Sequence, residues 1–190
     1  GNDEWSYEKS LPYMIKLEND LDITDQYHGN DGPIVIRRYQ PDELLDDQAA
    51  FIEAVTAAGY SQTDDHNHPA SSGVGPLPLN NPDGIRWSTA LGYLTMARDR
   101  PNFTISADSH TTRVLIENKK AVGIEYEKGG EVRQAYANEV VLSAGPIGSP
   151  HLLMLSGIGR REQLEAVGIE VIADMRGVGQ NLRDHPSVAV

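Results

Sequence analysis

The feature that most constrains the fold is a change of hydrophobic period in the second half of the chain. Between residues 102 and 138, four segments alternate apolar and polar residues, and the turn sequences NKK and KGGE separate the later ones. This alternation is typical of an antiparallel meander with one solvated face. The next run, EVVLSAG at 139–145, is continuously apolar, as in a strand buried on both faces of a parallel sheet. The sequence therefore predicts a meander that leads into one strand of an α/β sheet.

The first hundred residues have a helical pattern instead. Apolar residues recur at helical spacing in 5–19, 41–58 and 86–100, and the second of these begins with proline and several acids, as a helix N-terminus favours. A short strand is expected over 33–39. The intervening segment 61–84 is rich in Gly, Pro, Asn, Asp and His, and a loop of that length tends to be functional or disordered.

The C-terminal part returns to short alternating elements. We expect helices around 148–155 and over 160–168, a strand over 169–175 and a loop over 177–186. The predicted fold class is therefore mixed, α+β with α/β. A helix-rich part, residues 1–100, precedes a part with the meander and one α/β strand, residues 101–190.

Composition excludes several classes of function. The 190 residues carry a formal net charge of −12, which argues against nucleic-acid binding and against a basic membrane-surface patch. The absence of cysteine excludes disulfides and thiolate metal sites. No apolar run approaches the roughly 20 residues of a spanning helix, and the N-terminus has no secretory pattern, so we expect a cytoplasmic protein. The chain begins without Met and stops within an expected strand, which suggests a piece of a longer protein.

Small residues end the predicted buried strand, at Ser143, Ala144 and Gly145. Ligands of open α/β sheets lie outside the carboxyl ends of strands, and small residues there allow close approach to the backbone. A tight turn without a ligand explains the same residues equally well. Both interpretations stay open on the residues alone.

A second candidate is the loop sequence DDHNHP at 64–69. Its residues Asp64, Asp65, His66 and His68 have the chemistry of metal ligands. No distant further ligand is indicated, so a solvated loop is favoured over a metal site.

The loop NLRDHP at 181–186 contains Asn181, Asp184 and His185. An Asp next to a His resembles a catalytic pair, but neighbouring side chains often point apart, so local capping by Asp184 is favoured. Ser156 does not stand in a nucleophile elbow, which requires G-x-S-x-G after a strand, and is interpreted as a helix-end serine.

One long motif resembles a known family. The pattern is Gly145-Pro146-x-x-Ser149-Pro150-x-Leu152-Leu153-x-x-Ser156-Gly157-Ile158-Gly159. It resembles the second sequence signature of the glucose–methanol–choline (GMC) oxidoreductases. Segments such as YHGNDGPIVI, DGIRWSTALGYL and GVGQNLRDHP resemble choline-dehydrogenase-type members in the expected order, so the resemblance covers essentially the whole chain.

The resemblance implies flavin chemistry. Family members bind FAD on a Rossmann-like domain and oxidise alcohols by hydride transfer to the flavin, while a histidine takes the hydroxyl proton. By this resemblance Ser143, Ala144 and Gly145 lie beside the adenosine part of FAD, and Thr111 matches the family's adenine contact. The family's loop near the cofactor corresponds to the segment of this chain that contains Asn181, Asp184 and His185. Residues 101–190 then form the meander and a partial FAD-binding domain, and 1–100 the helical part of the substrate or cap domain.

Two family features are missing from the sequence. The G-x-G-x-x-G phosphate loop is expected before Gly1, and the catalytic histidine with its His or Asn partner after Val190, so no catalytic residue is assigned here. We therefore expect a piece of an FAD-dependent alcohol dehydrogenase or oxidase that is inactive alone, retains no FAD and pairs with the rest of the same enzyme. The alternative is a free-standing, non-catalytic binding domain derived from the same fold.

Overall fold

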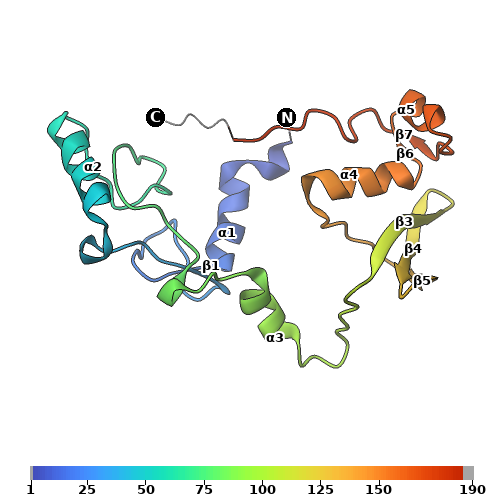
Figure 1. Cartoon of the computed structure of the whole chain (residues 1–190), viewed down its shortest axis with the longest axis horizontal. Coiled ribbons are helices and arrows are strands. Elements are labelled where there is room, and N and C mark those ends of the chain that lie inside the picture. The colour runs from blue at the N-terminus through green and yellow to red at the C-terminus, as the bar shows by residue number, and fades with distance from the viewer. Residues whose placement is uncertain (1, 186–190) are drawn as a thin grey trace. The chain divides into compact units, whose positions relative to one another are not determined.

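The computed structural model describes residues 2–185 and divides into two compact units, Gly1–Phe103 and Thr104–Val190. Each unit combines short helices with a small sheet (Figure 1). The fold is thus mixed, as the sequence predicts. Within residues 2–185, no helix has both the length and the apolar character needed to cross a membrane.

The first unit begins with a capped helix that leads into a buried strand. After the 3₁₀ turn η1 (Asp3–Trp5), helix α1 (Tyr7–Leu17) lies within the predicted range 5–19, and the Ser6 hydroxyl accepts the N–H of Lys9 at 3.4 Å. Strand β1 (Glu18–Asp20) follows directly and pairs in parallel with β2 (Ile34–Ile36), which confirms the strand expected over 33–39. Because strand side chains alternate, the first and third residues of β1 share one face, and both are buried.

The helix predicted over 41–58 is interrupted, which corrects the sequence expectation. Its proline opens a separate 3₁₀ turn, η2 (Pro41–Glu43), and α2 (Asp46–Ala57) begins only afterwards. The carboxylate of Glu43 accepts the N–H of Gln40 at 2.8 Å and closes the turn before α2 starts. Gly59, at φ +95°, follows the end of α2 as expected.

The helix predicted over 86–100 is also shorter than expected. It consists of one π-helical segment, η4 (Ala90–Leu94), and one turn of α-helix, α3 (Thr95–Ala97). The indole N–H of Trp87 donates to the carbonyl of Pro33 at 2.9 Å and ties this segment to the start of β2. Apart from the 3₁₀ turn η3 (Pro82–Gly84), the segment 61–84 is the loop that its composition predicts.

The second unit is built on the predicted meander. Strands β3 (His110–Glu117), β4 (Lys120–Lys128) and β5 (Glu131–Tyr136) form an antiparallel sheet in that order. Both connecting turns contain two successive residues at positive φ, the conformation that matches the twist of a tight hairpin. The first predicted segment, 102–109, is wrong as a strand, because it is irregular and Asp108 adopts φ +54° at its end.

The buried parallel strand predicted at 139–145 is not formed in this structure. Residues 139–144 have no strand pairing, and Val141 is 77% exposed. A parallel strand exists only through hydrogen bonds to neighbouring strands, and within residues 2–185 no strand pairs with this run. The apolar pattern is present, but a sequence pattern alone cannot supply the neighbours.

The remaining predicted helices are confirmed. Helix α4 (Gly145–Leu155) covers 148–155, and α5 (Arg161–Ala166) lies within 160–168. Between and after them, β6 (Ile158–Gly159) pairs in parallel with β7 (Ala173–Asp174), so the strand expected over 169–175 shrinks to two residues. The core of this unit is small, and its most buried apolar side chains are Val114, Leu152 and Leu164.

Candidate functional site

A cavity of about 720 Å³ lies in the second unit between the meander, the run 139–144 and helix α4. Its volume falls within the range of about 300–1,000 Å³ typical of small-molecule sites. The walls are mainly apolar, with hydroxyl groups from Thr111 and Ser143 and an imidazole from His151 among the lining residues. The cavity can therefore take a largely apolar ligand with a few polar atoms.

Three of the residues predicted to contact FAD line this cavity together: Thr111, Ser143 and Ala144. Gly145 follows directly as the first residue of α4 and adopts φ +81°, a conformation that a residue with a Cβ rarely takes. Gly148 brings the helix close to the preceding run, since a Cβ on it would lie 3.0 Å from the Cβ of Ala144. The small residues thus let a ligand approach the backbone here, and the FAD contacts themselves stay a prediction.

The other three predicted residues are not brought to this cavity. Asn181, Asp184 and His185 lie in the C-terminal segment and are exposed, and none belongs to the cavity lining. The Asp184 carboxylate accepts the backbone N–H of His185 at 2.8 Å, and both side chains are fully exposed. This is the local capping that the sequence favoured, and a role near the cofactor remains a prediction.

Ser156 joins the end of α4 to strand β3. Its hydroxyl accepts the backbone N–H of Val114 on β3 at 2.8 Å and donates to the carbonyl of Leu152 on α4 at 2.6 Å. Both bonds are buried, and Ser156 follows the last residue of α4, as the helix-end interpretation predicts. At the other end of α4, the Ser149 hydroxyl accepts the N–H of Ala144 at 2.9 Å. The Ser156 bond thus fixes the end of α4 against β3, and the Ser149 bond fixes the start of α4 against the preceding run.

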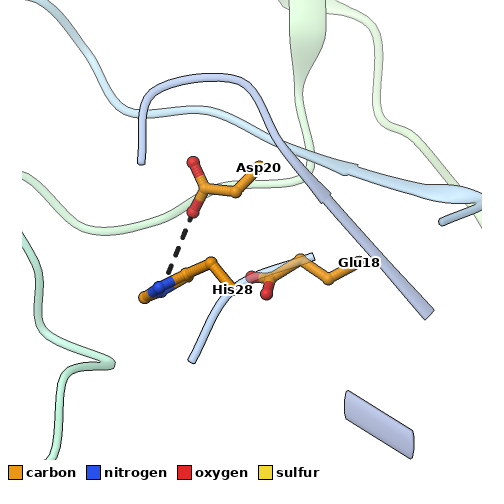
Figure 2. Close-up of side chains that lie close together, drawn as sticks. All are labelled: Glu18, Asp20 and His28. Carbon is orange, nitrogen blue, oxygen red and sulfur yellow. Dashed lines mark ion pairs between the residues drawn. The ribbon is translucent and has the colours of Figure 1, made fainter. Parts of the chain in front are cut away.

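A second candidate site is a group of buried charged side chains in the first unit, here named the buried charge cluster: Glu18, Asp20, His28, Arg38 and Asp65. Each residue is at most 8% exposed. Figure 2 shows the side chains of Glu18 and Asp20 reaching from β1 toward the imidazole of His28. Charged groups are buried in proteins only with partners, so the cluster is a built feature of the fold.

Arg38 and His28 hold the cluster together. The guanidinium of Arg38 donates to both carboxylate oxygens of Asp20, at 2.9 and 2.8 Å, and to Oδ1 of Asp65 at 3.0 Å. The His28 ring has Nδ1 2.8 Å from Oδ1 of Asp25 and Nε2 3.5 Å from Oδ2 of Asp65 and 3.9 Å from Oδ2 of Asp20. One oxygen of Glu18 accepts the N–H of Gly29 at 3.2 Å.

The burial of the cluster perturbs its ionisation. Burial raises the pKa of Glu18 above 4.5, although the N–H of Gly29 and the charge of His28 oppose it. Burial lowers the pKa of His28, but the hydrogen bond to Asp25 and the nearby carboxylates outweigh it and leave that pKa above 6.5. The same hydrogen bond lowers the pKa of Asp25. Glu18 and His28 therefore both hold a proton more tightly than the free side chains do.

The cluster also has the spacing of a metal site. One ligand atom from each of Glu18, Asp20 and His28 lies within 4.8 Å of the other two. The loop residues singled out by the sequence behave differently, because His66 Nε2 lies 3.1 Å from the carbonyl of Gly75, and His68 Nδ1 accepts the N–H of Ala70 at 3.1 Å.

Only one residue of that loop sequence, Asp65, belongs to the cluster. Sequence reasoning missed the other four members, which are spread from residue 18 to residue 38. The available signal was the alternation of two acids in the segment END, residues 18–20, which forms strand β1.

Comparisons with known proteins identify the family. The family model for GMC oxidoreductase matches residues 1–187. The chain is 46% identical over 189 residues to the oxygen-dependent choline dehydrogenase of Photobacterium profundum, covering 99% of this chain and 33% of that protein. It is 42% identical to the mitochondrial choline dehydrogenase of Homo sapiens, with 98% and 31% covered. The chain thus spans about a third of the length of these curated relatives.

Solved structures give the same result. Pyridoxine 4-oxidase from Mesorbium loti matches with a TM-score of 0.86 and 34% identity, over 93% of this chain and 35% of that one. An FAD-dependent oxidoreductase from Chaetomium thermophilum matches with a TM-score of 0.87 and 31% identity, over 97% and 34%. The chain belongs to the GMC oxidoreductase family.

Proposed function

We propose that this chain is part of an FAD-dependent oxidoreductase that oxidises the CH–OH group of a small alcohol, with choline-like alcohols as the first candidates. The observation that carries this proposal is the family match over residues 1–187, together with choline dehydrogenases at 42–46% identity. The bound FAD would supply the hydride acceptor. Because the chain spans a third of these relatives, the reaction belongs to the whole protein.

The residues present fit the adenosine part of FAD. The cavity in the second unit offers apolar walls for a planar ring, hydroxyl groups from Thr111 and Ser143, and close backbone approach at Ala144 and Gly148. On this basis the unit Thr104–Val190 would hold FAD as part of a Rossmann-like domain, and Gly1–Phe103 would contribute to the substrate or cap domain.

The proton acceptor of the reaction is proposed to lie outside this chain. No histidine of the chain matches the family's catalytic base, which is expected after Val190, and the phosphate loop is expected before Gly1. The role of this chain is then to bind and orient the cofactor. The chain by itself is expected to retain no FAD and to be inactive.

The test uses the full-length protein that contains this chain. We expect it to purify with a flavin absorption band that is bleached by choline under anaerobic conditions. Ala144→Leu fills the cavity and is expected to lower the ratio of flavin to protein, whereas Ala166→Leu, on the exposed face of α5, leaves that ratio unchanged. Full flavin content in Ala144→Leu would contradict the proposed cofactor position, and colourless full-length protein would contradict the flavin function.

The alternative of a free-standing binding domain is less well supported. Val141 and Ile147 are 77% and 72% exposed, and both lie at the cavity end of α4 or just before it. Large apolar side chains exposed to this extent are expected on a surface that another part of a protein covers. The same purification decides between the two. The binding domain is favoured if the full-length protein carries no flavin and the 190-residue chain alone is stable and monodisperse.

A further inference from the structure

We propose that the buried charge cluster is a binding site for one divalent cation, Zn²⁺ or Mn²⁺, with Glu18, Asp20 and His28 as ligands and the carboxylate of Asp65 beside them. Carboxylate oxygen and imidazole nitrogen are the ligands that these ions take. The site lies within the first unit and shares no residue with the cavity of the second unit. It would be a structural site, since its ligands are buried.

The spacing of the donor atoms supports the proposal. Two ligands that each bind an ion at about 2.1 Å lie at most about 4.2 Å apart. The separations of 3.5 Å between His28 Nε2 and Asp65 Oδ2, and of 3.9 Å between His28 Nε2 and Asp20 Oδ2, satisfy this limit. The ligand atoms of Glu18, Asp20 and His28 lie within 4.8 Å of one another, so binding needs a contraction of no more than about 0.6 Å.

An unpartnered atom points to the ligand independently. Oδ2 of Asp65 is buried and accepts no hydrogen bond from residues 2–185, and it lies 3.5 Å from Nε2 of His28. A buried carboxylate oxygen without a partner is costly, and a cation would satisfy it. The other oxygen of Asp65 accepts from Arg38, which fixes the side chain with Oδ2 turned toward the imidazole.

The imidazole is arranged as in many metal sites. Nδ1 of His28 lies 2.8 Å from the carboxylate of Asp25, so in the neutral ring Nδ1–H donates to Asp25 and the lone pair of Nε2 faces the cluster. A carboxylate that accepts the second ring N–H is the usual partner of a metal-binding histidine. Asp25 would be this orienting residue, and its side chain lies at the edge of the cluster, 34% exposed.

Charge balance also favours a divalent ion. With His28 neutral, three buried carboxylates face one guanidinium, which leaves two negative charges in a buried space. One divalent cation neutralises them. Arg38 does not block the ion, because a carboxylate oxygen has two lone pairs and Oδ2 of Asp20 uses one for Arg38. The competing way to neutralise the cluster is a proton on His28 and another on Glu18.

The experiment is calorimetric titration of ZnCl₂ and, separately, MnCl₂ into the full-length protein after chelator treatment. We expect one ion per chain with a Kd below about 1 µM, and metal that co-purifies on elemental analysis. His28→Gln is expected to weaken binding by at least about 100-fold and Asp25→Asn by about 10–100-fold. His68→Gln, a histidine outside the cluster, is expected to bind as wild type.

Three outcomes overturn the proposal. If the folded wild-type protein binds neither ion tightly, the two negative charges of the cluster are balanced by protons on His28 and Glu18. Loss of binding in His68→Gln, with binding retained in His28→Gln, would place a metal in the loop 64–69 instead. A ¹⁵N spectrum in which His28 stays doubly protonated with saturating zinc would exclude it as a ligand. Circular dichroism of each variant shows that any loss of binding is not a loss of fold.

Discussion

Replacing Ser156 by alanine removes the link between β3 and α4. The hydroxyl accepts the buried N–H of Val114 at 2.8 Å, and this N–H lies on the edge of β3 that faces away from β4. The methyl group of alanine cannot accept, and Ser156 is only 5% exposed, so water does not replace the bond freely. The variant therefore leaves one donor unpaired in the small core of the second unit.

The expected loss follows from that donor. A buried polar group left without a partner costs about 1–3 kcal/mol in the free energy of unfolding. The carbonyl of Leu152 loses a hydroxyl donor but keeps the N–H of Ser156 at 3.1 Å, so it adds little. For a chain of 190 residues each kcal/mol lowers Tm by about 2–4 °C. We therefore expect Tm to fall by about 2–12 °C.

Differential scanning calorimetry measures Tm, and amide hydrogen exchange followed by NMR measures the protection of Val114. Ser106→Ala is the matched control, because Ser106 is an exposed serine of the same unit and surface substitutions change stability by within about 0.5 kcal/mol. The reasoning is refuted if Ser156→Ala melts with Ser106→Ala and the Val114 amide exchanges at the wild-type rate.

Three further substitutions test separate parts of the fold. Arg113 holds the pKa of Glu125 below 4.5, so this pair stabilises the chain above pH 4.5 and the contribution is lost as pH falls through the lowered pKa. Arg113→Ala should raise that pKa in an NMR titration, and an unchanged value contradicts the pairing. Gly157→Ala should lower the free energy of unfolding in urea more than Gly168→Ala does. Both glycines have positive φ, so alanine at either position costs about 1–2 kcal/mol. Only at Gly157 would the new Cβ also meet a backbone carbonyl oxygen, at 2.5 Å. Arg38→Met leaves buried carboxylates uncompensated and should cost about 3–5 kcal/mol, measured the same way; a loss equal to that of an exposed arginine would show that the cluster is solvated.

The sequence predicts well those elements whose causes are local. The three strands of the meander follow from alternation and from turns such as Gly129-Gly130, whose φ values of +62° and +81° suit a tight hairpin. Helix α4 follows from its apolar run after Gly145. Each of these depends on residues that are neighbours in the chain, so the pattern is sufficient.

The errors have non-local causes. The run 139–145 has the composition of a buried strand, but pairing depends on strands that the pattern does not specify. The helix predicted over 41–58 breaks because Glu43 closes a turn on Gln40. The buried charge cluster could not be predicted because the sequence around Asp65 is typical of a solvated loop. Its burial depends on the hydrogen bond from Arg38, which lies 27 residues earlier in the chain.

The unpaired run 139–144 also affects how the chain behaves in solution. It combines apolar β-formers with a backbone that pairs with no strand of residues 2–185, and Val141 is 77% exposed. Such an edge is a template for pairing with a second chain of the same sequence. When the 190-residue chain is produced without the rest of the protein, its aggregation should begin at this segment, and a lysine in place of Val141 should raise its solubility.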